Sequence, residues 1–327
     1  MSLNYNIYYS DEKIMILYSE YIDDYDFIKN LNNNVYIFFQ FGWNIEPYIN
    51  QVIPSMEKQI IDINPTYNVK KNLIYCSPTE SCNNILLNMD RNSIFLNHNA
   101  LLDYNMYEIH NYKRKYNAVI NARPLKWKRI YLSKKVENKI YIKGVDYENN
   151  ELSWKDWDEC NFKEIVYNIS LNEVIDLYNK SNIGLMLSGC TGENKQGIKE
   201  GANYSSSEYL LCGLPVVSTI SQGGRDIWYD EYNSIVCEPD EDIINNSVNT
   251  LLKKINNNEI NRYKIRDNHI KKMIDIRKNY INKVQEIFNE YNINEDSNKY
   301  FNQHFYNKLT NYSIEKEKTI KQMNSLI

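Results

Sequence analysis

The chain has little cysteine, histidine, glycine or proline for its 327 residues, and these shortages narrow the possible protein classes. Its six cysteines form no Cys-x-x-Cys pair and its four histidines show no metal-ligand spacing, which argues against a disulfide scaffold or a zinc site. No apolar run approaches the roughly 18 residues of a membrane-spanning helix, and the first residues hold no apolar signal segment. A net charge of −4 lacks the basic character of a nucleic-acid-binding protein. We therefore expect a cytoplasmic protein with reduced thiols and no nucleic-acid partner.

The few glycines gather in one window of the sequence. Eight of the ten lie between Gly184 and Gly224. Glycine is placed where the backbone turns tightly or approaches a ligand closely. We therefore expect most of the special backbone geometry, and a ligand site with it, in this window.

Short apolar segments alternate with helical periodicity along the chain. This alternation predicts an α/β fold with parallel sheets, whose strands are buried on both faces. Helical periodicity appears at 173–180, 206–211 and 244–255, and one amphipathic stripe runs from Met273 to Tyr291. We expect the polar remainder of the chain to be helical and a domain boundary near 111–115. The predicted strands are 35–41, 73–76, 94–96, 118–120, 140–142, 165–167, 183–187, 216–219 and 235–237.

A local cluster of positive charge follows the proposed boundary. It holds nine basic and no acidic side chains, which are Lys113, Arg114, Lys115, Arg123, Lys126, Lys128, Arg129, Lys134 and Lys135. A solvated basic face is the alternative, and we prefer it for Lys134 and Lys135. Arg123 and Lys128 directly follow the strand at 118–120, in the loop where open α/β sheets bind ligands. A planar guanidinium and a mobile ammonium at this place predict binding of an anion such as phosphate.

Two glutamates, Glu200 and Glu208, mark the second candidate site. Their spacing alone is weak, because Glu12/Glu20 and Glu151/Glu159 repeat it. The surrounding order carries more weight: an apolar strand, a glycine-bearing loop, a helix start rich in serine, and a further strand. The amide groups at a helix start suit a diphosphate, and a carboxylate one turn further accepts hydrogen bonds from a ribose diol. The alternative is a surface loop with two solvated glutamates.

Two Asp-x-Asp sequences need the same treatment, since such pairs bind metals at strand ends in some enzymes. Neither Asp24-Tyr25-Asp26 nor Asp156-Trp157-Asp158 follows a predicted strand with suitable partners. We interpret both as surface acids and expect no metal site.

The stretch from Tyr116 to Asp240, over a third of the chain, resembles the C-terminal half of the family 4 retaining glycosyltransferases of GT-B fold. It carries a strand followed by Arg-x4-Lys (Arg123 and Lys128) and the Glu-x7-Glu motif with its tail Cys212-Gly213-Leu214-Pro215-Val216-Val217. Gly223-Gly224 and Asn233 continue the family order. In the other half, Asn97-His98-Asn99-Ala100 is similar to the segment that brings a histidine to the donor sugar.

This resemblance implies two Rossmann-like domains that face each other across a cleft, with C-terminal helices. We expect an acceptor-side domain at 1–113, a nucleotide-sugar-binding domain at 114–270, and helices at 271–327 that pack back towards the first domain. The short N-terminal domain has only Gly42 before Gly144, so a role of Gly42-Trp43 as its phosphate or acceptor loop stays open.

The resemblance also implies a role for each candidate residue. Arg123 and Lys128 would neutralise the leaving diphosphate, Glu200 would bind the donor sugar, and His98 would lie near the transferred sugar. Glu208 would hold the nucleotide ribose. The remaining expected donor-binding residues are Gly201, Asn203, Ser205, Ser206 and Ser207. Members of the family need no metal, and no cofactor is expected here besides the donor itself.

The predicted activity is therefore retaining transfer of a hexose from a nucleotide sugar to a glycan, lipid-linked or other acceptor. The base of the donor, whether uracil, guanine or thymine, stays open. An epimerase or phosphorylase on the same scaffold, and a degenerate domain that binds without turnover, remain alternatives. For His98 a structural role is the alternative. A basic run at 264–278 leaves peripheral contact with the inner face of a membrane open, beside its reading as a solvated helix face.

Overall fold

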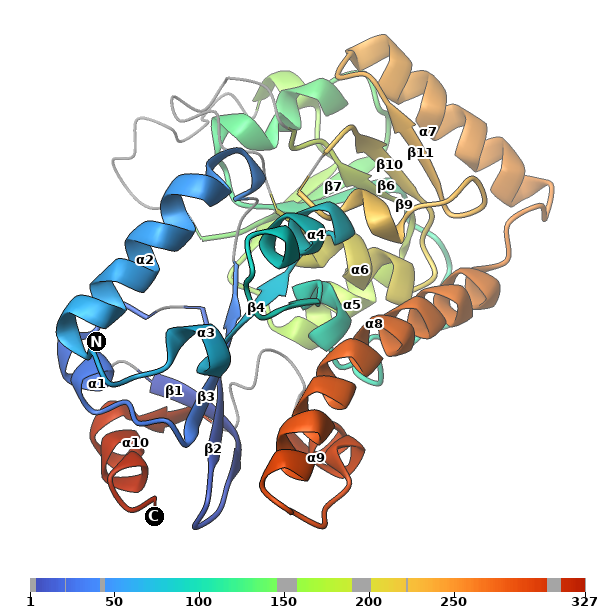
Figure 1. Cartoon of the computed structure of the whole chain (residues 1–327). Coiled ribbons are helices and arrows are strands. Elements are labelled where there is room, and N and C mark those ends of the chain that lie inside the picture. The colour runs from blue at the N-terminus through green and yellow to red at the C-terminus, as the bar shows by residue number, and fades with distance from the viewer. Residues whose placement is uncertain are drawn as a thin grey trace. The chain divides into compact units, whose positions relative to one another are not determined.

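The computed structural model describes residues 4–20, 22–41, 45–145, 158–189, 201–221, 223–304 and 313–326. The chain divides into two compact units, whose elements are labelled in Figure 1. Unit 1 comprises Met1–Asp103 and Met273–Ile327, and unit 2 comprises Tyr104–Lys272. Helix α8 (Arg262–Glu290) begins in unit 2 and continues into unit 1. The limits 113/114 and 270/271 stay predictions.

Unit 1 is built on a six-stranded sheet of order β12-β1-β2-β3-β4-β5. The strands from β2 to β5 are parallel, whereas β1 runs antiparallel to both β2 and β12. Every residue of β2, β3 and β4 is buried, which accounts for their uninterrupted apolar sequences. The strands are β1 (Asn4–Ser10), β2 (Met15–Ser19), β3 (Val35–Gln40), β4 (Leu73–Ser77), β5 (Ser93–Phe95) and β12 (Ser313–Glu315).

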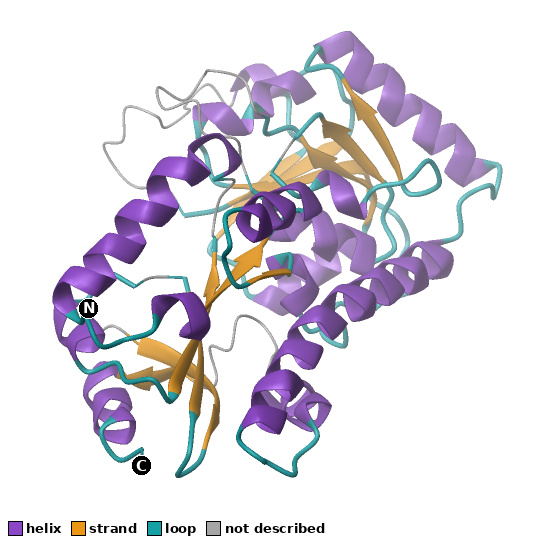
Figure 2. Ribbon diagram, in the orientation of Figure 1, coloured by secondary structure: helices purple, strands orange, loops and turns teal. Residues whose placement is uncertain are grey.

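Helices cover both faces of this sheet, as Figure 2 shows. Successive residues of β2 point to opposite faces, so Met15 and Leu17 join one core cluster while Ile16 and Tyr18 join the other. The second cluster includes residues of α8, which confirms its predicted apolar stripe. The helices of unit 1 are α1 (Tyr25–Lys29), α2 (Ile49–Ile63), α3 (Val69–Asn72), α4 (Glu80–Asn88), α9 (Ser297–His304) and α10 (Lys316–Met323).

Unit 2 holds a six-stranded sheet of order β11-β10-β9-β6-β7-β8, and all its strands are parallel. The chain builds outward from β6 to β8, returns to the middle, and builds outward again from β9 to β11. The direction of winding therefore reverses between β6 and β9, and ligands bind at the carboxyl ends of strands at such a switch point. The strands are β6 (Tyr116–Ala122), β7 (Lys139–Lys143), β8 (Glu164–Tyr167), β9 (Ser181–Met186), β10 (Val216–Thr219) and β11 (Ser234–Cys237).

Two helices of unit 2 begin at well-defined side-chain caps. Ser170 and Glu173 form a capping box at the start of α5 (Leu171–Asn179), and Asp240 caps α7 (Glu241–Asn256). Helix α6 (Tyr204–Leu211) lies between β9 and β10 in sequence. The stripe on α7 that the sequence predicts is buried in the core of unit 2 through Ile244, Val248 and Leu251.

The predicted α/β class is confirmed, and each of the nine predicted strands is present with small shifts at its ends. The sequence prediction omitted β1, β2 and β12. The remainder of the chain after α8 was expected to be helical, yet it contributes β12, which pairs with β1 some three hundred residues earlier. Such a three-residue strand depends on its partner, because local propensity does not distinguish it from a loop.

Asp24 and Asp26 of the first Asp-x-Asp sequence form ion pairs that connect α1 to α10 within unit 1. Asp24 caps α1 by accepting from the amide of Phe27 at 2.8 Å. The ammonium of Lys316 lies 2.8 Å from a carboxylate oxygen of Asp24 and 3.1 Å from one of Asp26. Within the described ranges, no helix is long and apolar enough to cross a membrane.

We expect the buried ion pair between Arg91 and Glu57 to stabilise unit 1 strongly. Arg91 lies 2.6 Å from Glu57 through Nε and 2.7 Å through Nη2, and the hydroxyl of Tyr75 donates to the same carboxylate at 2.9 Å. Arg91→Ala leaves this carboxylate buried without its cation, which costs about 3 kcal/mol in the free energy of unfolding. Urea unfolding followed by circular dichroism measures the loss.

Lys70→Ala is the matched control, because Lys70 and Asp90 form an ion pair of 2.8 Å that is largely exposed. Its unfolding midpoint should stay close to that of the wild type. Equal losses in the two variants would contradict the account.

Candidate functional site

A pocket of about 220 Å³ lies at the switch point of unit 2, between the carboxyl ends of β6 and β9. Arg123 and Lys128 line it from the segment after β6, and Ser188 lines it from the end of β9. Asn203 and Ser205 line it from the start of α6. The structure thus brings four of the predicted site residues, Arg123, Lys128, Asn203 and Ser205, into one pocket.

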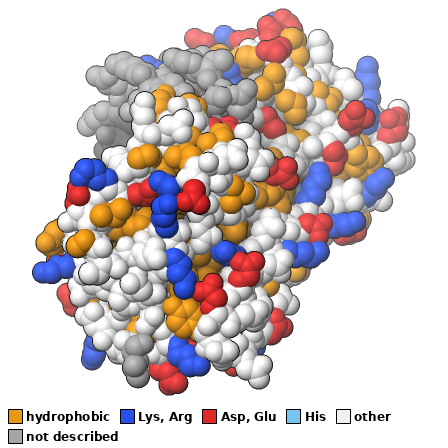
Figure 3. Space-filling view, viewed as in Figure 1, with side chains coloured by type: hydrophobic (Ala, Val, Ile, Leu, Met, Phe, Trp, Pro, Cys, Tyr) orange, Lys and Arg blue, Asp and Glu red, His pale blue; other side chains and the backbone are white. Residues whose placement is uncertain are grey.

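Most other cations of the basic cluster are engaged elsewhere in unit 2. Arg114 donates to the carbonyl of Asn179 at 2.6 Å and Arg129 donates to that of Leu187 at 2.9 Å. The ion pairs are Lys115–Glu164, Lys134–Glu159 and Lys135–Asp242. On the face that Figure 3 shows, basic and acidic side chains are interspersed rather than gathered by sign. Arg123 and Lys128 therefore stand out within the cluster because they line a pocket.

Two buried arginines, Arg129 and Arg225, hold the strand ends beneath this pocket. Arg129 adopts a left-handed backbone (φ 47°), and its Nη2 donates to the hydroxyl of Thr219 at 2.8 Å. Nη2 of Arg225 donates to the carbonyls of Ser188 at 2.9 Å and Thr219 at 2.6 Å. A Cβ at Gly189 would lie 1.8 Å from Nη2 of Arg129, so only glycine leaves room for this guanidinium. The two guanidinium groups thus fix the ends of β9 and β10 beside the pocket.

The start of α6 presents a different set of groups from the three hydroxyls that the sequence suggested. Of the three serines, Ser205 lines the pocket, and its hydroxyl donates to the carbonyl of Asn121 at 3.0 Å. Ser206 and Ser207 are fully buried, and Ser206 is hydrogen-bonded to the hydroxyl of Tyr229. The side-chain oxygen of Asn203, the N-cap residue, accepts from Arg225 at 3.2 Å instead of capping the helix. Gly201 is buried and forms an isolated parallel bridge to Gly223.

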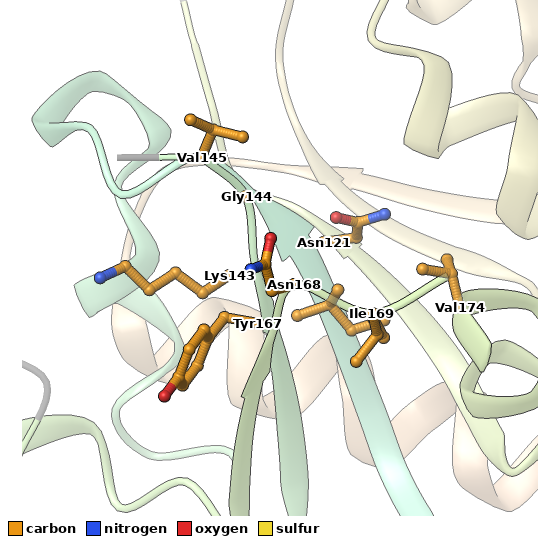
Figure 4. A pocket seen from close by; sticks show the side chains of 9 residues that line it. Asn121, Lys143, Gly144, Val145, Tyr167, Asn168, Ile169 and Val174 are labelled. Carbon is orange, nitrogen blue, oxygen red and sulfur yellow. The ribbon is translucent and has the colours of Figure 1, made fainter. Parts of the chain in front are cut away.

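A larger cavity of about 590 Å³ adjoins the pocket at the carboxyl ends of β6, β7 and β8. Asn121 and Gly144 line both spaces, so the two spaces adjoin at these residues. Figure 4 shows the residues that surround this cavity, which are Asn121 from β6, Lys143, Gly144 and Val145 from the end of β7, Tyr167, Asn168 and Ile169 from the end of β8, and Val174 from α5. The cavity is mainly apolar, with amide groups at its edge.

Two tyrosines donate hydrogen bonds to the carboxylate of Glu208, which is a residue of α6. One carboxylate oxygen accepts from the hydroxyl of Tyr107 at 3.1 Å, and the other accepts from that of Tyr178 at 2.6 Å. The hydroxyl of Tyr178 in turn accepts from the amide of Asn121. Burial raises the pKa of Glu208, although the two tyrosine hydrogen bonds partly oppose the rise. Glu208 is not among the residues that line either cavity, and it connects to them through Tyr178 and Asn121.

His98, the other predicted catalytic residue, belongs to unit 1. It begins the 3₁₀ turn η2 (His98–Leu101) after β5 and is 5% exposed. Asn97 caps the turn, and the buried guanidinium of Arg277 donates to the carbonyls of Ala100 at 2.6 Å and Leu102 at 2.7 Å. Its position is therefore fixed from both ends of the turn.

The basic run at 264–278 is partly turned inward. Arg277 is 3% exposed, and Arg266 donates to the carbonyl of Leu211 at 2.7 Å. Lys272 pairs with Asp230, and Lys278 pairs with Asp275. These contacts leave fewer of its cations for a membrane surface than the sequence suggests.

Some predicted positions lie outside the described residues, namely Glu200, Gly42-Trp43 and Asp156-Trp157. In the part of the chain that the structure describes, no three His, Cys, Asp or Glu side chains gather as a group that could hold a metal ion.

Sequence reasoning missed several residues of the site. The sequence assigned no role to Asn121 or to Arg225, which directly follows Gly223-Gly224, and it pointed to Arg129 only as part of the basic cluster. A strand-end position signals Asn121. Tyr107 and Tyr178 carry no signal in the sequence, since the fold alone brings them to Glu208.

No family model matches the chain, and no curated protein matches it either. Solved structures match in fold. HepE of Anabaena in complex with UDP gives a TM-score of 0.54 at 12% identity, over 77% of this chain and 72% of HepE. A variant of S. aureus TarM in complex with fondaparinux, α-GlcNAc-glycerol and UDP gives 0.53 at 16% identity, over 76% of this chain and 50% of TarM.

The pneumococcal O-GlcNAc transferase GtfA in complex with UDP and GlcNAc gives a TM-score of 0.52 at 14% identity, over 81% of this chain and 59% of GtfA. The chain thus spans only about half the length of TarM and somewhat more of GtfA. At these identities the likeness shows the fold, which is that of the GT-B glycosyltransferases.

The raised pKa of Glu208 predicts how its replacement changes stability with pH. Because the folded pKa lies above the ordinary 4.5, the folded state holds this proton more tightly than the unfolded state does. The stability from protonated Glu208 is complete below pH 4.5 and is lost as pH rises through the raised pKa. Glu208→Gln should therefore gain stability relative to the wild type as pH rises above 4.5 and through the raised pKa of Glu208.

Urea unfolding of both proteins at several pH values above 4.5 measures the difference between their free energies of unfolding. The other titrating groups contribute equally to the two proteins and cancel in this difference. A difference that stays constant or falls with pH would show that burial does not dominate at Glu208.

Proposed function

We propose that the protein transfers a sugar from a UDP-sugar donor to a glycan or lipid-linked acceptor, with retention at the anomeric carbon and without a metal. The observation that carries this proposal is the placement of Arg123 and Lys128 in a pocket at the switch point of a parallel sheet. A cavity of about 590 Å³ adjoins the pocket at Asn121 and Gly144, and it has room for a nucleoside.

The smaller pocket suits the diphosphate. Arg123 offers a planar fork to phosphate oxygens and Lys128 offers a mobile positive charge. The first turn of α6 adds the positive end of a helix dipole at Ser205. Buried Arg129 and Arg225 add two further charges behind the lining. Five sources of positive potential around about 220 Å³ favour a doubly charged group.

The larger cavity suits the base. Its walls are mainly apolar, and Ile142, Ile169 and Val174 can pack against a planar ring. Three structures of matching fold contain UDP, which makes uracil the base that we propose. The ribose then lies between the two spaces, beside Asn121, which is connected to Glu208 through Tyr178.

In the proposed reaction the bond between the anomeric carbon and the diphosphate oxygen breaks, and an acceptor hydroxyl bonds to the same face of that carbon while its proton passes to the departing diphosphate oxygen. Negative charge grows on the diphosphate, and Arg123 and Lys128 stabilise it. Glu200 binds the donor sugar and His98 acts near the transferred sugar, which are the roles that the resemblance implies.

Replacement of either pocket cation should slow the reaction strongly. We expect Arg123→Ala and Lys128→Ala each to cut turnover by about a hundred- to a thousandfold, because each removes a donor aimed at the developing charge. Release of UDP from a UDP-sugar, with or without acceptor, provides the assay. Lys135→Ala is the matched control, since this cation pairs with Asp242 and lies outside the pocket lining.

Wild-type turnover in Arg123→Ala and Lys128→Ala would contradict the proposed site. If the wild type binds UDP-sugar tightly and releases no UDP with any acceptor, the protein is instead a binding domain on this scaffold.

Turnover should also survive removal of divalent cations. The charge of the diphosphate is met by Arg123 and Lys128, so we expect the same rate of UDP release in excess EDTA as in added Mg²⁺ or Mn²⁺. A strict requirement for either ion would contradict a mechanism that rests on side-chain cations.

A further inference from the structure

Asn121 occupies the junction between the two spaces of unit 2. It lies near the carboxyl end of β6, and it lines both the pocket of about 220 Å³ and the cavity of about 590 Å³. Gly144 is the other residue that lines both spaces, and it has no side chain to offer. Asn121 is therefore the polar side chain at the place where the two spaces meet.

The order of groups in a nucleoside diphosphate is base, ribose, diphosphate. With the base in the larger cavity and the diphosphate beside Arg123 and Lys128, the ribose must cross the junction. An amide oxygen has two lone pairs, so it accepts hydrogen bonds from ribose hydroxyls. Figure 4 shows the amide oxygen of Asn121 on the side of Gly144 and Asn168, and its nitrogen on the opposite side.

The backbone of Asn121 is fixed by α6. Its amide N–H donates to the hydroxyl of Tyr209 at 2.7 Å, and its carbonyl accepts from Ser205 at 3.0 Å. Both contacts hold the main chain of β6 and leave the side chain to be oriented separately.

Tyr178 orients the side chain of Asn121. The nitrogen of the amide donates to the hydroxyl of Tyr178, which donates its own proton to Glu208 at 2.6 Å. This hydroxyl has one proton, and Glu208 accepts it, so Asn121 must present N–H to Tyr178 and turn its oxygen the other way. Burial and the nearby carboxylate raise the pKa of Tyr178 well above its ordinary value, so the proton stays in place.

The ring of Tyr178 is itself held in place. It is fully buried and packs edge-on against Tyr209, with ring centroids 4.9 Å apart. Glu208 also accepts from Tyr107 at 3.1 Å, which fixes the carboxylate at the far end of the chain of hydrogen bonds. The direction of every hydrogen bond from Glu208 to Asn121 is thus determined.

We propose that Asn121 binds the ribose of the donor through its amide oxygen, and that Tyr178 is the positioning residue that orients this amide. The inference rests on the proposed binding of a nucleoside diphosphate in unit 2. It places a ribose contact at Asn121, which lines both spaces, and connects it through Tyr178 to Glu208, the residue for which the resemblance implies a ribose contact.

The experiment compares the affinity for UDP with that for 2′,3′-dideoxyuridine diphosphate, which lacks both ribose hydroxyls. Isothermal titration of the wild type gives the preference for UDP as a ratio of dissociation constants. Asn121→Ala and Tyr178→Phe should each lower this preference about three- to tenfold, the effect of one neutral hydrogen bond. Their affinity for the dideoxy nucleotide should stay near that of the wild type, which also shows that the site is folded.

Tyr116→Phe is the matched control. Tyr116 lies at the other end of the same strand, is buried, and donates its hydroxyl to a carboxylate, that of Glu164. It lines neither space, so its loss should leave the preference for UDP unchanged.

The double variant Asn121→Ala with Tyr178→Phe separates orientation from an independent effect. If Tyr178 acts through Asn121, the double variant loses no more preference than Asn121→Ala alone. Additive losses would overturn the positioning role of Tyr178, and an unchanged preference in Asn121→Ala would overturn the ribose contact. A wild type that binds neither nucleotide would refute the proposed function itself.

Discussion

The hydrogen bonds from Arg129 and Arg225 to the ends of β9 and β10 are the constraint on which the candidate site depends. Carbonyl groups at strand ends need partners, and a pocket at the switch point leaves them facing inward. Arg129 donates to the carbonyl of Leu187, and Arg225 donates to the carbonyls of Ser188 and Thr219. These bonds set the positions of Ser188 and of Asn203, and with them the wall opposite Arg123 and Lys128.

The same arrangement determines the chemistry that the site can perform. Both guanidinium groups donate to backbone carbonyls at these strand ends, and Arg225 also lies 3.9 Å from a carboxylate oxygen of Asp226. In the proposed function, a ligand with two negative charges binds beside these cations. In that proposal the same buried cations support the strand ends and favour the anion, while Arg123 and Lys128 add the charges that contact the ligand directly.

Part of the candidate site could be predicted from the sequence, because the carboxyl ends of the strands in a parallel sheet meet at one edge. Arg123 and Lys128 were predicted from their place after β6, and the pocket lining includes both. What the sequence did not predict depends on contacts between distant residues. Tyr178 and Glu208 lie thirty residues apart and Tyr107 lies a hundred residues before Glu208, and no local pattern links them. Burial of Ser206 and Ser207, likewise, depends on which face of α6 packs against the sheet.

The missing strands of unit 1 have a similar cause. The partners β1 and β12 come from opposite ends of the chain, so their pairing is settled by tertiary structure. By contrast, β3, β4 and β10 were predicted almost to the residue, since uninterrupted apolar runs belong to strands buried on both faces.

The most direct test of the account is a thermal-shift screen of the wild type against UDP-, GDP-, ADP- and dTDP-sugars, repeated with Arg123→Ala. A ligand at a hundred times its dissociation constant stabilises the folded state by about 2.7 kcal/mol. The account predicts that a UDP-sugar raises the melting temperature of the wild type and does so much less in the variant. Equal shifts in the two proteins, or no shift with any of the four donors, would contradict it.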